Sequence, residues 1–239
     1  MTEQKLKVNF YDKLKTNYLG KNFIYYSEID STQSEIWRNI NAFPDGTLVM
    51  ADIQTSGKGT HGRTWHTQSN NIAFSFLIKP NCLVTNLDGL TLEIAKLIVE
   101  IVKNKYDIEI NIKKPNDLMK NGKKLGGILT ETKINSEIAK FLVIGIGINN
   151  SQEIFQNEIK DIATSIKNEF NKTIDPIDFV AEFCNKFENI LINKRYLKYW
   201  INIVIYSTNM QIFLYIIYWR KKINKFIMKI SFILWEENI

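Results

Sequence analysis

The chain has 239 residues, of which 45% are hydrophobic, and a formal net charge of +6 at pH 7. This length can bury one full core with a small appended module, and the composition is globular. The positive charge suits an acidic partner or substrate, but it is too diffuse to indicate a nucleic-acid-binding face. Cys82 and Cys184 form no metal-ligand spacing. With no signal peptide at the start, the chain is expected in a reducing cytoplasm.

The first elements are a lead-in, a strand and a helix start. Residues 1–22 are polar and lysine-rich, which predicts a helical or loosely ordered lead-in, and residues 23–26 read as a strand. Thr32 and Glu35 have the spacing of a capping box, so the hydroxyls of Ser31 and Thr32 can be explained as helix caps. A helix N-terminus also presents free N–H groups to a ligand. Both interpretations are open at this point.

A glycine-rich stretch at residues 54–65 follows. It lies between two apolar, β-prone runs at 46–53 and 71–78, which predicts a loop between two strands. Its glycines let a ligand approach the backbone N–H groups, and Lys58 and Arg63 supply cationic donors for phosphate or carboxylate. The stretch is therefore a candidate anion cradle. A plain flexible loop is an equal alternative, because the G-x-G-x-x-G match precedes a strand rather than a helix.

Residues 87–106 carry apolar side chains at helical spacing, and residues 108–113 alternate as a strand does. Pro115 fixes the backbone where this strand should end. Asn116 and Asp117 are thereby presented in a turn. A turn alone explains them; the functional alternative is that Asp117 handles magnesium or ribose while Asn116 fixes a polar edge of a ligand.

A hairpin is predicted at Asn121-Gly122, with a strand over 123–131 after it. Lys124 lies just past this turn, where a lysine is usually solvated. A further strand at 141–150 carries Gly145 and Gly147 at alternate positions, so one face is bare and can receive a flat ligand. Close packing against a helix explains the same pattern equally well.

Five segments together resemble one family. They are residues 30–32, the glycine-rich stretch, 113–117, 124–129 with Glu131, and 145–149. Their order and spacing are similar to the catalytic domain of biotin protein ligases, also called biotin–[acetyl-CoA-carboxylase] ligases. The resemblance covers residues 23–168. Because no DNA-binding pattern precedes Phe23, a monofunctional ligase that does not bind DNA is expected.

The resemblance implies an α/β (α+β) fold: a mixed sheet flanked by helices, of the class II aminoacyl-tRNA synthetase-like biotin/lipoate ligase kind. It implies that biotin and ATP, with Mg²⁺, give biotinyl-5′-AMP, which a lysine of a biotin carboxyl carrier domain of a carboxylase then attacks. Joining a carboxylate to a triphosphate needs cations and N–H donors aimed at the developing charge. A homodimer is left open.

The resemblance also implies residue roles. The catalytic positions are Lys124, Arg63 and Lys58, with Lys124 steering the biotin carboxylate and phosphate oxygens. The biotin-binding positions are Ser31, Thr32, Gln33, Gln54, Lys58, Gly59, Thr60, Gly127, Gly145 and Gly147. The nucleotide-binding positions are Arg63, Trp65, Asn116, Asp117 and Asn149, with Asp117 as magnesium ligand. The glycine-rich stretch would close over the adenylate to keep water out.

The sequence departs from the family pattern within this site. The family loop typically reads Gly-Arg-Gly-Arg-x-Gly-Arg, whereas Lys58 and Thr60 stand where two of its arginines are usual. Lysine keeps the charge without the bidentate fork, and threonine keeps neither. Lys114 replaces the usual tryptophan before the proline. We therefore expect the adenylate to be held less tightly than in an arginine-containing relative.

The tail departs further. Relatives usually end in an SH3-like β-barrel that helps to recruit the carrier domain, but residues 201–219 hold no charged residue and no glycine. We place the catalytic domain at residues 23–200 and an atypical segment at 201–239. We consider three interpretations of this tail: a pair of strands or a buried helix, a displaced reading frame, and a membrane-seeking segment. Its polar residues make it a poor membrane span.

Two other functions are open. A lipoate-protein ligase shares the fold, but a different arginine- and histidine-rich loop is expected there. A degraded homologue that binds biotin or the adenylate without transferring it is favoured by Thr60, Lys114 and the unusual tail.

Overall fold

The computed structural model describes residues 3–193, 201–208, 211–222 and 225–234. The main body is built on nine strands: β1 (Phe23–Ile29), β2 (Leu48–Lys58), β3 (Thr64–Thr67), β4 (Ile72–Ile78), β5 (Cys82–Leu83), β6 (Asn111–Lys113), β7 (Asp117–Lys120), β8 (Lys123–Asn135) and β9 (Ile138–Ile148). They form one mixed sheet in the order β1-β2-β4-β9-β8-β7-β6, with β3 paired to β2 and β5 to β9. β1 is parallel to β2, and β2 is antiparallel to β4.

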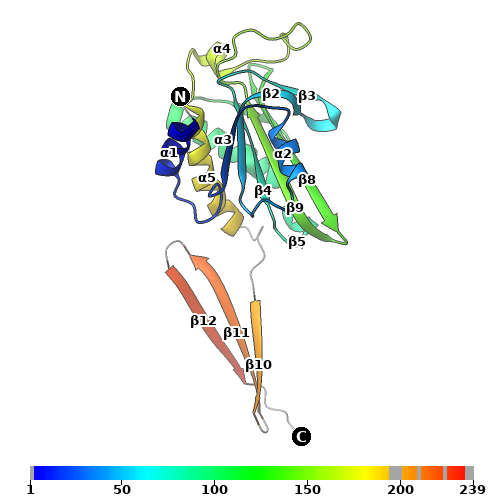
Figure 1. The fold of residues 1–239 in the computed structure, drawn as a ribbon, viewed down its shortest axis with the longest axis vertical. Coiled ribbons are helices and arrows are strands. Elements are labelled where there is room, and N and C mark those ends of the chain that lie inside the picture. Colours follow the sequence, from blue (N-terminus) through cyan, green and yellow to red (C-terminus); the bar gives the residue numbers. More distant parts are fainter. Residues whose placement is uncertain (1–2, 194–200, 209–210, 223–224, 235–239) are drawn as a thin grey trace.

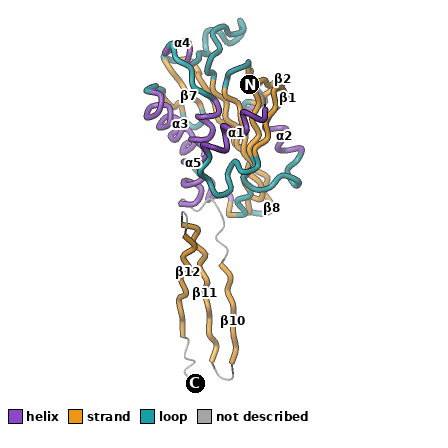
Figure 2. Tube along the Cα trace, turned by 60° about the vertical axis from the view of Figure 1, so that its left-hand side comes forward, coloured by secondary structure: helices purple, strands orange, loops and turns teal. Residues whose placement is uncertain are grey.

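Helices flank this sheet on both faces. They are α1 (Glu3–Lys13), α2 (Thr32–Arg38), α3 (Leu90–Tyr106), α4 (Ile166–Phe170) and α5 (Pro176–Asn193), with 3-10 turns η1 (Thr60–Gly62) and η2 (Val84–Leu87). Figure 2 shows α1, α3 and α5 on one side of the strands and α2 on the other. The expected α/β fold, a mixed sheet flanked by helices, is confirmed.

The alternation of β4 sorts its side chains between the two faces. Phe74 and Phe76 turn toward α5, where their rings lie 5.7 and 5.8 Å from that of Phe183. The alternate residues turn toward α2, and Leu77 packs there with Ile36 in a smaller cluster. The large core therefore lies under α1, α3 and α5. The α2 face stays shallow and leaves room for a site beside that helix.

Several predicted elements are confirmed. The helix expected at 87–106 is α3, the strand expected at 141–150 is β9, and the hairpin turns at Asn121 and Gly122, whose φ values are 48° and 77°. The strand expected at 108–113 is wrong in its first half, because β6 begins at Asn111. Ile108 and Ile110 are buried in the core, which accounts for the apolar alternation that suggested a strand there.

The lead-in is a helix that joins the core. Leu6 and Phe10 of α1 are buried. The chain that follows is tied to α5 by the buried carboxylate of Glu188, which accepts hydrogen bonds from the backbone N–H groups of Asn17, Tyr18 and Leu19 at 2.7 to 3.0 Å. One carboxylate thus satisfies three backbone donors that would otherwise be buried without partners.

We expect Glu188→Ala to lower the free energy of unfolding by about 3 kcal/mol, because it strands these buried donors. Urea denaturation followed by circular dichroism measures the change. Glu182→Ala, on the same helix with Lys186 4.0 Å away at the surface, is the control and should stay near wild type. Equal midpoints for the two variants would contradict the anchoring role of Glu188.

The tail forms a second sheet. β10 (Ile201–Thr208), β11 (Gln211–Lys222) and β12 (Lys225–Leu234) pair antiparallel in that order. Figure 1 shows these three strands in orange and red. The strand interpretation is confirmed over these ranges, with three strands instead of the expected pair. The domain boundary predicted after residue 200 falls outside the described residues.

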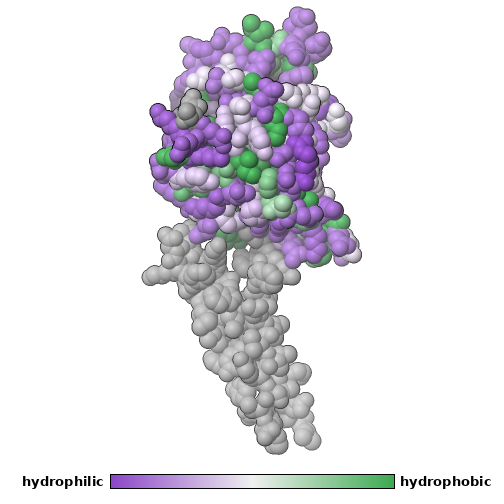
Figure 3. Space-filling view, viewed as in Figure 1, coloured by the Kyte–Doolittle hydropathy of each residue, from purple (hydrophilic) through white to green (hydrophobic). Residues whose placement is uncertain are grey.

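The surface of the described body is mainly polar. Figure 3 shows hydrophilic residues over most of the visible face, with separate apolar spots between them. Within the described ranges, no helix combines the length and apolar character needed to cross a membrane.

Candidate functional site

The N-terminus of α2 opens onto the shallow face of the sheet. Ser31 is the N-cap, and its hydroxyl accepts a backbone N–H one turn later at 3.3 Å. The capping box predicted from Thr32 and Glu35 is therefore wrong. Glu35 accepts instead from the Tyr26 hydroxyl at 3.0 Å and the Arg38 guanidinium at 2.6 Å. These side-chain donors hold the Glu35 carboxylate away from the helix N-terminus. The Thr32 hydroxyl, which does not cap the helix, donates to Gln54 instead.

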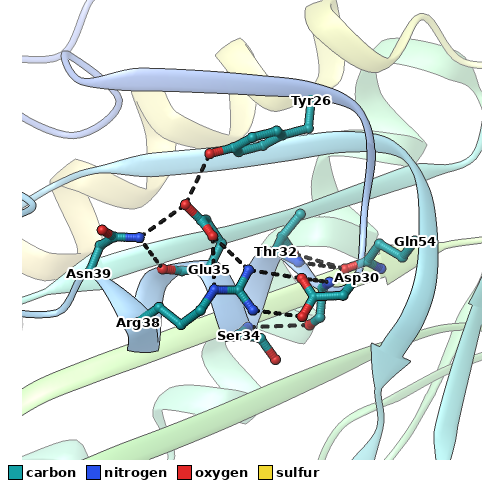
Figure 4. Close-up of polar contacts among 9 residues, drawn as sticks. Tyr26, Asp30, Thr32, Ser34, Glu35, Arg38, Asn39 and Gln54 are labelled. Carbon is teal, nitrogen blue, oxygen red and sulfur yellow. Dashed lines mark hydrogen bonds and ion pairs between the residues drawn. The ribbon is translucent and has the colours of Figure 1, made fainter.

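Asp30 fixes the entry to this helix (Figure 4). Its carboxylate accepts a bidentate pair of hydrogen bonds from Arg38 at 2.6 and 2.9 Å, and one oxygen also accepts the Ser31 N–H at 2.7 Å. The Arg38 guanidinium lowers the pKa of Asp30 to about 2. Asp30 and Arg38 are half exposed, so solvent screening keeps the pair's contribution to stability small. Its effect is to orient the first turn of α2.

Thr32 and Gln54 hold each other on the floor of the site, as Figure 4 shows. The Gln54 carbonyl oxygen accepts from the Thr32 N–H at 2.8 Å and from its hydroxyl at 3.1 Å. The Gln54 amide group donates to Thr67 at 2.9 Å, and the hydroxyls of Thr32 and Ser75 are 2.8 Å apart. Neutral donors and acceptors are thus fixed at one place on the sheet.

The predicted bare face of β9 is present. Gly145 and Gly147 turn toward the α2 side, and Gly127 of β8 pairs with Gly147. A Cβ at Gly147 would overlap the indole of Trp65, and a Cβ at Gly145 would overlap the carboxamide oxygen of Gln33. The glycines therefore make room for flat groups, and the group that lies on Gly147 here is the protein's own indole.

The glycine-rich stretch is a β-hairpin extension. β2 continues to Lys58 and pairs with β3, which contains Trp65. The predicted loop is therefore wrong at both ends, and only the tip from Gly59 to Arg63 turns, closed by a hydrogen bond from the Gly59 N–H to the Arg63 carbonyl at 2.7 Å. The pairing of β2 with β3 needs a residue without a side chain at Gly57, because a Cβ there would overlap the backbone carbonyl oxygen of Trp65. The pairing brings Trp65 onto the sheet face.

At the tip, Thr60 holds the Arg63 side chain. The guanidinium donates to the Thr60 hydroxyl at 2.6 Å and to its carbonyl at 3.1 Å. Lys58 and Arg63 are exposed, and Thr60 is half-buried. The threonine that departs from the family pattern thus orients the arginine that remains.

Lys124 is the best-held cation of the site. Its ammonium lies 2.5 Å from a carboxylate oxygen of Asp117 and 5.9 Å from the centre of the Trp65 ring. The backbone N–H of Lys124 donates to the Ile162 carbonyl at 2.7 Å, and its backbone carbonyl accepts from the Thr164 N–H at 2.9 Å. The alternative of a solvated lysine is wrong, because the side chain is ion-paired and only 29% exposed.

Two clefts meet at this lysine. The first has a volume of about 450 Å³ counted to its open mouth, and the second about 700 Å³. Both are lined by Gly59, Thr60, Trp65 and Lys124. The first cleft is also lined by these predicted residues: Ser31, Thr32, Gln33, Gln54, Lys58, Asn116, Gly127, Gly145 and Gly147. The predicted site is therefore gathered at one place.

The second cleft contains Arg63 and Asn149 among the predicted residues. Sequence reasoning missed its apolar wall, formed by Phe155, Ile159 and Ile162. The sequence feature that could have indicated this wall is the polar stretch at 151–162, which also carries aliphatic and aromatic residues. Ile162 is 64% exposed, which is unusual for a residue type that normally lies in the core.

Asp117 lines neither cleft, and its carboxylate is taken by Lys124. Asn116 is tied to β8, since its amide group donates to the Ile128 carbonyl at 3.2 Å. Over the described residues, no group of three or more His, Cys, Asp or Glu side chains is placed to hold a metal ion. The single carboxylate of Asp117, paired with an ammonium, supplies too few ligands for a magnesium site built by protein groups alone.

The predicted residues of this site lie in a stretch of sequence that matches a known protein family. Residues 25–149 match the Biotin/lipoate A/B protein ligase family. The chain belongs to this family. The matched residues run from β1 to the end of β9 and so include both the glycine-rich hairpin and Lys124.

Relatives of known name extend the match. The bifunctional ligase/repressor BirA of Bacillus subtilis is 38% identical over 191 residues, which are 78% of this chain and 57% of BirA. The chain thus spans a little over half the length of this relative. The biotin–[acetyl-CoA-carboxylase] ligase of Paracoccus denitrificans is 27% identical over 163 residues, 63% of this chain and 65% of that protein.

Solved structures of family members share the fold. The biotin protein ligase of Aquifex aeolicus in complex with biotin and ATP is 26% identical, with a TM-score of 0.58, over 90% of this chain and 99% of that one. The Leishmania major biotin protein ligase in complex with biotinyl-5-AMP covers 88% of this chain and 98% of its own at 22% identity, with a TM-score of 0.54. The second likeness shows the fold alone.

Proposed function

We propose that this family member is an ATP-dependent biotin protein ligase, which activates biotin as biotinyl-5′-AMP and transfers it to a lysine of a biotin carboxyl carrier domain. The observation that carries the proposal is the meeting of two clefts at one held lysine, Lys124. An enzyme that joins two substrates needs adjoining sites, and where both substrates are anions a cation between the sites stabilises the charge that develops. The named relatives and the Aquifex aeolicus structure support the same choice.

The first cleft suits the biotin head. A ureido ring has one carbonyl oxygen and two N–H groups, and it needs neutral partners fixed in advance. Ser31, Thr32 and Gln54 offer such groups, with Thr32 and Gln54 held by each other. The glycines of β8 and β9 add no side chains of their own to the floor, where the Gln33 carboxamide lies over Gly145 and the Trp65 indole over Gly147. The carboxylate tail of biotin would then point along the cleft toward Lys124.

The second cleft suits the nucleotide. Its wall of Phe155, Ile159 and Ile162 can cover a flat base, and the Trp65 indole forms the partition toward the first cleft. Arg63 stands at the mouth with its guanidinium oriented by Thr60, where it can bind phosphate oxygens. Asn149 lies at the base of the cleft and donates to the Thr164 carbonyl at 2.9 Å.

Lys124 would act on the reacting atoms. As a biotin carboxylate oxygen attacks the α-phosphorus and the bond to the departing pyrophosphate breaks, negative charge grows on the phosphate oxygens, and a held ammonium stabilises that charge without reorganising. Asp117 orients the ammonium before the substrates arrive. Magnesium enters as part of the substrate MgATP, bound by the phosphates, and the assignment of Asp117 as its ligand stays a prediction.

For the second half-reaction, the glycine-rich hairpin tip must shield the mixed anhydride from water until the carrier lysine attacks. Lys58, Thr60 and Arg63 border the mouth. A homodimer, the absence of DNA binding and a cytoplasmic location stay predictions from the sequence.

The test of the proposed function is a streptavidin blot of an apo biotin carrier domain incubated with this protein, biotin and MgATP. ATP-dependent signal on the carrier lysine is the expected result, and a carrier with that lysine replaced by arginine is the control. Biotin binding by calorimetry without any transfer would instead favour the binding-only homologue that Thr60 and Lys114 suggest.

Replacing Lys58 should alter how long the intermediate stays bound. We expect Lys58→Arg to slow release of biotinyl-5′-AMP about tenfold, because the guanidinium fork binds the phosphate bidentately where the ammonium binds it once. Release is measured by chasing preformed radiolabelled adenylate with unlabelled ligand. Lys21→Arg, remote from both clefts, is the matched control, and an unchanged release rate for Lys58→Arg would contradict the expectation.

A further inference from the structure

Gln33 carries an unused polar group at the floor of the first cleft. The side chain is only 3% exposed, and its carboxamide oxygen has no hydrogen-bond partner in the described part of the chain. The oxygen lies over Gly145, where any Cβ would overlap it. A buried carbonyl without a partner costs about 1–3 kcal/mol, so this oxygen needs a donor that the described part of the chain does not supply, either an ordered water or a ligand.

The hydrogen bond made by the NH₂ group of Gln33 determines the orientation of this carboxamide. The Gln33 amide group donates to a carboxylate oxygen of Glu131 at 2.8 Å. The Trp37 indole N–H donates to the same oxygen at 2.6 Å. A carboxylate can only accept, so the NH₂ group of Gln33 must face Glu131 and its oxygen must face the cleft. A flipped carboxamide would set two acceptors against each other.

The fold brings these three residues together from distant positions. Gln33 and Trp37 are four residues apart on α2 and so share one face of the helix. Glu131 lies on β8 at the alternate positions that also include Gly127 and Leu129, both of which line the first cleft. Glu131 itself lies beyond the lining, behind Gln33.

We propose that Glu131, assisted by Trp37, is a positioning residue that fixes Gln33 with its oxygen toward the ligand, so that Gln33 accepts a ring N–H of the ureido group. The inference rests on the proposed function, because it takes biotin as the ligand. It assigns to Glu131 a role in selecting a ring that carries N–H donors at the site of Gly145. A ring that presents an oxygen there would meet the Gln33 oxygen and be rejected.

The test compares biotin with its two cyclic-carbamate analogues, in each of which one ring N–H is replaced by oxygen. The proteins are the wild type, the double variant Glu131→Gln/Trp37→Phe, and Gln33→Met, and affinities come from calorimetry. A glutamine at position 131 offers both a donor and an acceptor, and phenylalanine at position 37 removes the indole N–H that would hold the oxygen of that glutamine in place, so the Gln33 carboxamide can turn over. Methionine at position 33 keeps the length of the side chain but lacks the carboxamide oxygen that accepts the ring N–H. Glu137→Gln, exposed at the turn after β8, is the matched control.

For one of the two analogues, the wild type and Glu137→Gln should bind at least tenfold more weakly than they bind biotin. In Glu131→Gln/Trp37→Phe and in Gln33→Met that ratio should fall to about threefold or less, with melting temperatures near wild type. A Glu131→Gln/Trp37→Phe variant that keeps the full wild-type ratio would overturn the inference. A wild type that does not bind biotin would overturn the proposed function itself, so the two failures are distinguishable.

Discussion

Lys124→Ala should lower the rate of biotinyl-5′-AMP formation by about 100-fold or more, while biotin still binds. The reason is that the ammonium at the junction of the two clefts acts mainly on charge that appears during attack, and removing one such group from an enclosed site typically costs about 10²–10³ in rate. Release of pyrophosphate in a single turnover measures the step, and calorimetry measures binding of biotin.

The control is Lys133→Ala, which removes an exposed lysine from the same strand, β8, far from both clefts. Its rate should equal that of the wild type. Loss of Lys124 also leaves the half-buried carboxylate of Asp117 without its ion-pair partner, so the double variant Lys124→Ala/Asp117→Asn separates this side effect. If the double variant regains wild-type turnover, the ammonium is not needed for the chemistry.

The residues of the site could be predicted because local patterns place them. Alternation along β9 puts Gly145 and Gly147 on one face whatever the rest of the chain does. The Asn121-Gly122 turn fixes the start of β8, and so fixes Lys124 close to it. The grouping of these pieces came from the family resemblance, since no single pattern states which strands are neighbours. The sheet order then brings β8 and β9 together.

What could not be predicted depends on contacts between distant side chains. Trp65 lies on Gly147, and Gln33 reaches Glu131, across 82 and 98 positions of sequence respectively. The Ser31 hydroxyl caps α2 as expected, but the capping box of Thr32 and Glu35 was misassigned. Tyr26 and Arg38 donate to Glu35, which local spacing does not reveal. The apolar wall of the second cleft lies in a polar stretch with neither helical nor strand periodicity.

The contact between Trp65 and Gly147 gives the second large expected effect. Gly147→Ala should lower the affinity for biotin and slow adenylate formation, each at least tenfold, because the new methyl group occupies the place of the indole and forces it into one of the clefts. Since Trp65 lines both clefts, its displacement disturbs the binding of either substrate. Calorimetry with biotin and intrinsic tryptophan fluorescence, which reports the indole environment, measure the change.

The double variant Gly147→Ala/Trp65→Ala decides whether this overlap is the cause. Removing the indole makes room for the methyl group, so the biotin affinity lost in Gly147→Ala should return to within about threefold of that of Trp65→Ala alone. If the two substitutions instead act independently, Gly147 is required for contact with the ligand and not for the packing of Trp65. Because ATP would bind in the cleft that Trp65 partitions, its affinity should stay low in both variants that lack the indole, and this second readout shows that the restored biotin site is local to β9.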